Sequence, residues 1–186
     1  MAQSQKTIVT QNDENFIRLD ETQHSAEDLL DRHDKYKITS IIAEGGMACV
    51  FHAKDKNCRR QVALKIVKYD KQDNTEFTHR FIEEAQIAAQ LDHPNILPVY
   101  DLNINQEGIP YYTMKLVKGK TLEQILTDLK NNDEETLKEY QLSKLLQVFN
   151  KICDAVSFAG SRGVVHRDLK PANIMIGEYG QVFIMD

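Results

Sequence analysis

The stretch that decides the fold is His166-Arg167-Asp168-Leu169-Lys170-Pro171-Ala172-Asn173, which lies between a long helical pattern and a short apolar run. It places an acid, a lysine two residues later and an amide three residues beyond that lysine around one proline. Any one of these residues alone is typical of a charged surface turn. Eight of them in this order favour a loop that carries polar chemistry.

Length and composition indicate an ordinary globular protein. The 186 residues are enough for one or two compact domains, and 41% are hydrophobic and 27% charged. No apolar run approaches the roughly 20 residues that span a bilayer, and the N-terminus lacks the apolar core of a signal peptide, so we expect no membrane partner. The three cysteines, Cys49, Cys58 and Cys153, have no metal-ligand spacing and predict reduced thiols in a cytoplasmic protein.

The net charge of −5 is concentrated at the N-terminus. Residues 1–35 contain eight acidic and four basic residues, which leaves twenty acidic and nineteen basic residues for the rest of the chain. We expect this polar, acidic segment to be a disordered tail, because it cannot bury enough apolar surface to offset its ordering entropy. The nearly neutral remainder has no basic stripe and predicts no nucleic-acid partner.

Hydrophobic periodicity predicts strands and one helix between residues 36 and 117. The expected elements are strands over Tyr36–Ala43, Cys49–Ala53 and Gln61–Val67, a helix over Thr75–Gln90, and strands over Ile96–Asp101 and Tyr111–Val117. Adjacent glycines, Gly45 and Gly46, form the first hairpin turn. The period of two in the third strand puts Ala63 and Lys65 on one face. This order predicts a small antiparallel sheet with one packed helix.

The pattern becomes helical after a joint at Lys118-Gly119-Lys120. Thr121 and Gln124 have the spacing of a capping box at a helix start. A long helix is expected over about residues 136–160, ended by Gly160 and Gly163. Its predicted apolar face contains Leu142, Leu145, Leu146, Phe149, Ile152, Cys153 and Val156.

The order of these motifs resembles a bacterial, eukaryotic-like Ser/Thr protein kinase domain from about Tyr36 to Asp186. The resemblance implies an α+β, two-lobe fold with a complete N-lobe over residues 36–117 and only the first part of the helical C-lobe over 118–186. Asp186 would open the family's Asp-Phe-Gly-type motif, so the chain is expected to be truncated there, poorly active and marginally stable, with the long helix exposing its apolar stripe. The alternative is a gene-calling or frameshift artefact.

The resemblance assigns the chemistry to six residues. Asp168 would accept the proton of the substrate hydroxyl or orient that hydroxyl, and Lys170 would neutralise charge on the transferred phosphoryl group. Lys65 would bind the phosphates and pair with Glu84, which we choose over Glu83 because Ala85 follows it as in the family. Metal binding, of Mg²⁺ or alternatively Mn²⁺, would fall to Asn173 and Asp186.

The remaining predicted residues would surround ATP. They are Ile42, Ala43, Gly45, Gly46, Val50, Ala63, Met114, Lys115, Val117 and Met175. Lys115 and Val117 would bind the adenine edge through their backbone groups, with Val50 and Ala63 above the ring and Met175 below it. Ala43 and Ala48 replace two glycines of the family's first turn. The turn tolerates the methyl group of an alanine wherever the backbone φ at that position stays negative.

The resemblance therefore implies an ATP-dependent kinase that phosphorylates Ser/Thr hydroxyls of a protein substrate. A second hypothesis belongs to another class: a non-catalytic module that binds ATP or pairs with another kinase lobe. Mg-ATP binding without transfer, unaffected by Asp168→Asn, would distinguish the module from the enzyme.

Overall fold

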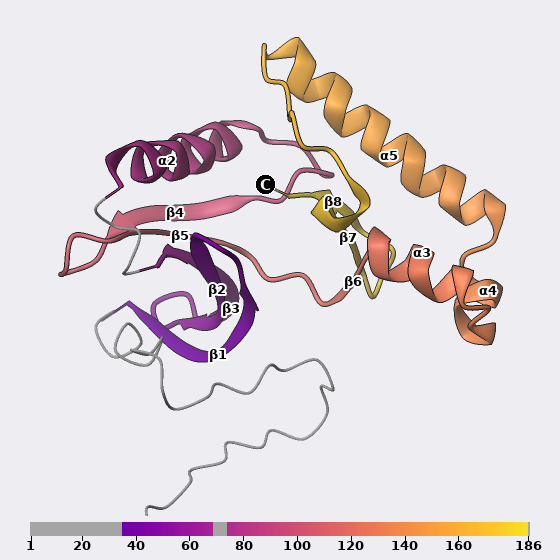
Figure 1. Cartoon of the computed structure of the whole chain (residues 1–186), viewed down its shortest axis with the longest axis horizontal. Helices are drawn as coiled ribbons and strands as arrows, with labels where there is room; N and C mark the ends of the chain where they lie inside the picture. The colour runs from indigo at the N-terminus through magenta and orange to yellow at the C-terminus, as the bar shows by residue number, and fades with distance from the viewer. Residues whose placement is uncertain (1–34, 69–73, 186) are drawn as a thin grey trace, which may run out of the picture.

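The structure is a computed structural model that describes residues 35–68 and 74–185. Its elements form two groups, each with its own sheet (Figure 1). The first contains β1 (Tyr36–Glu44), β2 (Ala48–Asp55), β3 (Arg60–Val67), α2 (Thr75–Gln90), β4 (Val99–Ile104) and β5 (Pro110–Lys115). The second contains β6 (Gly119–Thr121), α3 (Leu122–Lys130), α4 (Glu134–Glu139), α5 (Leu142–Ser161), the 3₁₀ turn η2 (Pro171–Asn173), β7 (Ile174–Gly177) and β8 (Val182–Ile184). Of the expected N-terminal tail, all but Lys35 lies outside the described residues.

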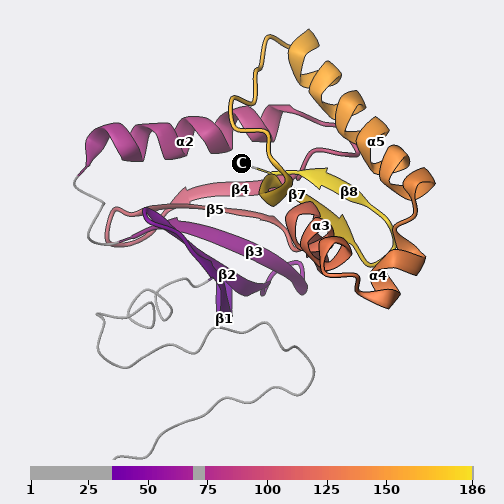
Figure 2. The same ribbon diagram turned by 45° about the vertical axis from the view of Figure 1, so that its right-hand side comes forward.

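The first group is an antiparallel sheet of five strands in the order β1-β2-β3-β5-β4. Helix α2 lies along β4 and β5 on one face of it (Figures 1 and 2). The buried residues of the strands and of α2 form one core cluster, which includes Phe51, Leu64, Ile66, Phe81 and Ala85. The predicted antiparallel sheet with one packed helix is therefore confirmed.

Helix α2 has the predicted bounds because both of its ends are marked in the sequence. The side-chain oxygen of Asn74 accepts a hydrogen bond from the amide of Phe77 at 3.0 Å, which satisfies one donor of the first turn. Pro94 lies shortly beyond the last turn, where a proline cannot continue a helix. Phe81 and Ala85, one turn apart, are the buried residues on the inner side.

The second group consists of helices and a three-stranded sheet in the order β6-β7-β8. The predicted capping box at the start of α3 is present: Thr121 and Gln124 each bond the other's backbone amide through a side-chain oxygen. The second core joins the helices to this sheet. It contains Ile125 of α3, Val148 and Ile152 of α5, Ile174 and Ile176 of β7, and Val182 and Ile184 of β8. Within the described residues, no helix has both the length and the apolar content needed to cross a bilayer.

The expected single helix over about 136–160 is wrong, because α4 and α5 are separate. The amide of Tyr140 closes α4 on the carbonyl of Thr136 at 2.8 Å, and the carbonyl of Gln141 then accepts the first bonds of α5. Tyr140 packs against the second core. We attribute the break to this packing, since neither glycine nor proline lies there.

The buried side of α5 also differs from the predicted face. Val148, Ile152 and Ala155 are buried, and of these only Ile152 belongs to the predicted set. Leu142, Leu146, Phe149 and Val156 are exposed, so the apolar stripe expected to be uncovered is uncovered. The pattern identified an amphipathic helix, but two apolar faces lie side by side on it and only one contacts the sheet.

Several strand boundaries differ from the prediction, and one strand was not predicted. Strand β4 begins at Val99 instead of Ile96, which makes only an isolated bridge with Ile184. Strand β5 ends at Lys115, two residues before Val117. Strand β6 was missed because its three residues are polar or glycine and form a strand only through pairing with β7.

The segment after α2 joins the two groups. The amide of Leu97 donates to the carbonyl of Ile184, and the amide of Ile184 donates to the carbonyl of Asn95, both at 2.9 Å. The side chain of Asn95 also donates to the carbonyl of Val182 at 2.9 Å. Since β8 ends one residue before Met185, this segment fixes the position of the chain next to Asp186.

We expect Gly119→Ala to lower the free energy of unfolding by about 2–3 kcal/mol, since the new side chain meets backbone that cannot move aside. Gly119 has φ +155°, and a Cβ there would lie 1.9 Å from the carbonyl oxygen of Ile176, which precedes its register partner Gly177 on β7. Urea unfolding measures the change. Gly160→Ala, in open space on α5, is the control and should be neutral or slightly stabilising; equal losses in both variants would contradict the argument.

Candidate active site

One row of side chains crosses four strands of the first sheet. The register pairs Ala43 of β1 with Val50 of β2, Val50 with Lys65 of β3, and Lys65 with Tyr112 of β5. Directly paired residues project from the same face of a sheet. The row therefore brings two predicted nucleotide-binding residues beside the predicted phosphate-binding lysine, under the first hairpin turn.

A cavity of about 590 Å³ lies between this row and α2. Predicted site residues on its wall are Ala43, Gly45, Val50, Lys65 and Glu84. Other predicted nucleotide-binding residues do not line it: Ile42, Gly46, Ala63, Met114, Lys115, Val117 and Met175. The cavity therefore corresponds to the part of the predicted site where phosphate groups would bind.

Lys65 and Glu84 form an ion pair at the inner end of the cavity. The Nζ of Lys65 lies 2.8 Å from Oε1 of Glu84, and the side chains are 15% and 39% exposed. Glu83, the neighbouring acid, is exposed. The helix period places Glu84 one turn after buried Phe81, on the side of α2 that faces the sheet. The pairing expected from the resemblance is thus present, and its catalytic role stays a prediction.

The first hairpin turn accommodates both alanines. Within the turn, the backbone amide of Gly45 donates a hydrogen bond to the carbonyl of Ala48 at 2.9 Å. Neither Ala43 nor Ala48 is among the described non-glycine residues with positive φ, so the condition under which a methyl group is tolerated is met. Lys68, directly after β3, forms an ion pair of 2.5 Å with Glu44 at the start of the turn.

The segment after β5 contains the residues predicted to hold adenine. Met114 pairs with Ala63 across the β3–β5 ladder, so their side chains share the face that carries Lys65. The amide of Lys115 donates to the carbonyl of Pro98, and its ammonium lies 4.5 Å from the ring centre of Phe183 in β8. Met175 lies on β7, opposite Thr121. Of these contacts, the one between Lys115 and Phe183 joins the end of β5 to the second sheet.

The loop from His166 to Asn173 has a defined geometry. The Oδ2 of Asp168 lies 2.8 Å from Nζ of Lys170. It also accepts a hydrogen bond of 3.2 Å from the side-chain nitrogen, Nδ2, of Asn173. That nitrogen also donates to the carbonyl of Asp168 at 3.0 Å. The hydrogen bond with Lys170 is the main reason that the pKa of Asp168 lies below its usual value, so the carboxylate is ionised at neutral pH.

The same loop is attached to the end of the described chain. His166 contacts the carbonyl of Met185 through Nε2 at 3.1 Å, and the amide of Met185 donates to the carbonyl of Asn173 at 2.9 Å. Arg167 has φ +63°, a turn in the left-handed region that re-aims the chain between His166 and Asp168. The residue before Asp186 is therefore tied to the predicted catalytic loop at two points.

Asn173 suits an oxygen-liganded cation. Because its amide nitrogen donates to Asp168, its carbonyl oxygen is the atom left to face a metal, and Mg²⁺ prefers oxygen ligands. The second predicted ligand, Asp186, lies outside the described residues. Among residues 35–68 and 74–185, no group of three His, Cys, Asp or Glu side chains is placed to hold a metal ion.

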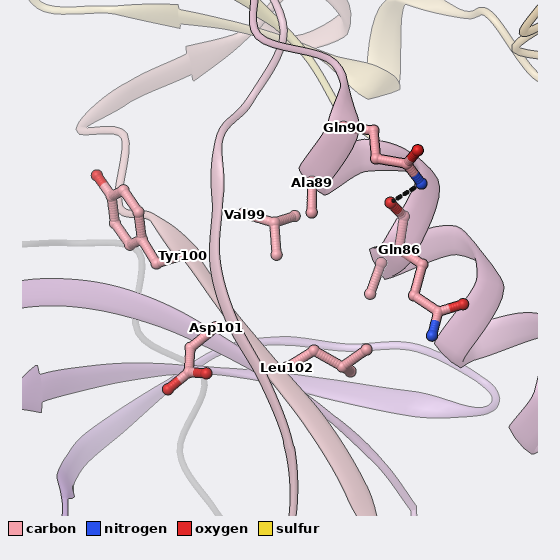
Figure 3. A pocket seen from close by; sticks show the side chains of 8 residues that line it. Gln86, Ala89, Gln90, Val99, Tyr100, Asp101 and Leu102 are labelled. Carbon is pink, nitrogen blue, oxygen red and sulfur yellow. Dashed lines mark hydrogen bonds between the residues drawn. The ribbon is translucent and has the colours of Figure 1, made fainter.

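A second cavity, of about 420 Å³, lies between α2 and β4 (Figure 3). Figure 3 shows Gln86 and Gln90 of α2 across from Val99 and Leu102 of β4, with one internal bond from the Gln90 side chain to the carbonyl of Gln86. The charged residue on its wall, Asp101, pairs with Lys35 at 2.6 Å. The cavity holds none of the predicted site residues, and we assign it no chemistry.

Sequence reasoning missed one residue of the site, Tyr112. Its hydroxyl donates to Oε1 of Glu84 at 2.8 Å, the same oxygen that pairs with Lys65. The period of two in β5 places Tyr112 on the face of Met114, which was a signal available in the sequence. The contact itself depends on where α2 lies, and no local pattern shows that.

Comparison with protein families matches residues 36–186 to a family described as the protein kinase domain. Curated relatives include the serine/threonine-protein kinase PknD of Protochlamydia amoebophila, 44% identical over 158 residues, and PknD of Chlamydia muridarum, 41% identical over 155 residues. Each match covers 82% of this chain and 16% of the relative. The chain thus spans about a sixth of the length of these proteins.

Solved structures with the same arrangement include the kinase domain of Mycobacterium tuberculosis PknI. The similarity has a TM-score of 0.67 at 25% sequence identity. It covers 82% of this chain and 58% of the PknI chain. The PknI kinase domain therefore shares both groups of elements, the first sheet with its helix and the second group with its helices, over most of this chain.

Proposed function

This chain belongs to the protein kinase family, and from that premise we propose that it transfers the γ-phosphate of ATP to serine or threonine hydroxyls of proteins. The observation that carries the proposal is the Asp168 carboxylate, held between the ammonium of Lys170 and the side-chain amide of Asn173. Phosphoryl transfer requires mainly positioning and charge stabilisation, which these groups can supply.

The proposed division of work follows from the charges. Asp168 is an ionised acceptor, so it can orient a substrate hydroxyl and take its proton. Lys170, at hydrogen-bond distance from the same carboxylate, places a positive charge where the transferred phosphoryl group would develop negative charge. A serine or threonine side chain offers a hydroxyl on a short stem, which fits the exposed position of this pair.

The nucleotide would bind with its phosphate groups in the cavity under the first hairpin turn and its adenine beside the segment that follows β5. Its phosphates would meet Lys65, which pairs with Glu84, while the backbone groups of Lys115 and Val117 would bind the adenine edge. Mg²⁺, or Mn²⁺ in its place, would be held by Asn173 and Asp186 and would neutralise charge on the phosphates when bound. We also propose a cytoplasmic location, because the three cysteines are free thiols.

The test is transfer of labelled γ-phosphate from ATP by the full chain, to itself or to a generic protein substrate. We expect label on serine or threonine after acid hydrolysis, dependent on Mg²⁺ and absent when EDTA is added. Binding of Mg-ATP with no transfer at any enzyme concentration would contradict the proposal and favour a non-catalytic nucleotide-binding module.

A further inference from the structure

Tyr112 contacts both members of the Lys65–Glu84 pair. Its hydroxyl donates to Oε1 of Glu84 at 2.8 Å, and the centre of its ring lies 5.6 Å from the ammonium of Lys65. Lys65 and Tyr112 are direct partners in the β3–β5 register, so the sheet itself places their side chains together. Glu84 reaches both from α2 and is the only part of this group that the sheet does not hold.

The phenol is a rigid donor. Tyr112 is 3% exposed, and its ring packs against Phe81 of α2 with 5.1 Å between ring centres. A buried tyrosine has few rotamers left, so its hydroxyl has a fixed position. The carboxylate it contacts is different: Glu84 is 39% exposed and could exchange its protein contacts for water.

An ion pair with such exposure does not by itself select one geometry. Pairs of this kind contribute little net free energy, because water competes and two long side chains lose rotamer freedom. A hydrogen bond from a neutral, buried donor to the carboxylate is stronger and directional. The oxygen of Glu84 nearest Lys65 is therefore the atom that Tyr112 fixes.

We propose that Tyr112 is a positioning residue that holds Glu84 in the orientation that presents Lys65 to the phosphates of ATP. The inference rests on the proposed function and adds a residue to it. Through this bond, strand β5 and helix α2 determine together where the lysine lies. Loss of the hydroxyl would let Glu84 turn toward water, and Lys65 would then sample positions away from the cavity.

Tyr112→Phe removes the hydroxyl and keeps the ring that packs on Phe81. We expect the dissociation constant of Mg-ATP, measured by direct binding, to rise three- to tenfold, and the transfer rate at saturating ATP to fall by a similar factor. Without nucleotide, we expect a weakly reactive acylating reagent to label Lys65 at least threefold faster, by mass spectrometry. Melting temperature, read on the same samples, reports on packing.

Tyr111→Phe is the matched control. It makes the same chemical change one residue earlier on β5, where the side chain lies on the opposite face and its ring meets Tyr36 edge-on at 6.1 Å. Binding, transfer and Lys65 labelling should stay within twofold of the unmodified chain.

A double-mutant cycle with Glu84→Ala separates positioning from packing. If Tyr112 acts through Glu84, adding Tyr112→Phe to Glu84→Ala should change binding and labelling by less than twofold. Effects that multiply, or a Tyr112→Phe variant within twofold of the unmodified chain in all three measurements, would overturn the inference. A chain that fails to transfer phosphate overturns the proposed function instead, because Lys65 labelling reads the role of Tyr112 without any transfer.

Discussion

Replacing Asp168 by asparagine is expected to lower the rate of phosphoryl transfer about a thousandfold, within the range that general-base groups contribute. Asparagine keeps the size of the side chain but cannot accept the proton of a substrate hydroxyl. Among the described residues, the side chain of Asp168 bonds within its own loop, to Lys170 and Asn173, and it does not line the cavity that would hold the phosphates of ATP. The dissociation constant of Mg-ATP should therefore stay within about twofold of the unmodified value, since binding energy is not drawn from this carboxylate.

Single-turnover transfer and equilibrium binding, measured on the same preparation, test this expectation. Asp154→Asn is the control, because it removes an exposed carboxylate from α5 without touching the loop. A rate that falls less than tenfold would contradict the role given to Asp168. A large loss of Mg-ATP affinity would show instead that the carboxylate supports the nucleotide site.

Lys65→Met is expected to lower transfer at least about a hundredfold, the scale seen when one preorganised charge-stabilising group is removed. Methionine fills most of the volume of the lysine stem but supplies no charge for the phosphates. It also leaves Glu84 without the Lys65 ammonium, while the hydrogen bond from Tyr112 to its carboxylate remains. Both effects act at the cavity, and binding of Mg-ATP should weaken together with transfer.

Direct binding measures the loss of affinity for Mg-ATP, and transfer at saturating ATP measures the loss of rate. Lys54→Met is the control, since Lys54 lies exposed on neighbouring strand β2. Urea unfolding should show no more than a small change for either variant, because Lys65 is not part of the apolar core. Transfer by Lys65→Met at the unmodified rate would remove this residue from the proposed mechanism.

Local patterns predicted most of the first sheet and of the loop. The bounds of α2 agree because Asn74 caps the helix and Pro94 follows it, and both signals lie within a few residues of the ends they mark. The period of two placed Lys65 and Ala63 on one face of β3, and the register confirms their partners, Tyr112 and Met114, on that face of β5. In these cases the sequence signal and the structural feature are local to each other.

The features that were missed depend on distant parts of the chain. The break between α4 and α5 follows from packing of Tyr140 on the second core, and β6 exists only as the partner of β7. The buried side of α5 could not be chosen from periodicity, because apolar residues occupy two neighbouring faces. Tyr112 was missed for the same reason: its acceptor, Glu84, is 28 residues away in the sequence.

The bond from the Asn95 side chain to the carbonyl of Val182 has a consequence for the order of folding. It joins residues 87 positions apart, whereas β1 pairs with β2, and β2 with β3, across short turns of the chain. Closing a loop of that length costs conformational entropy before any contact compensates it. We therefore expect the first sheet to form early and the joint at Asn95, Leu97 and Ile184 to form last, so that the loop ending at Asn173 reaches its final place beside Met185 only when folding is nearly complete.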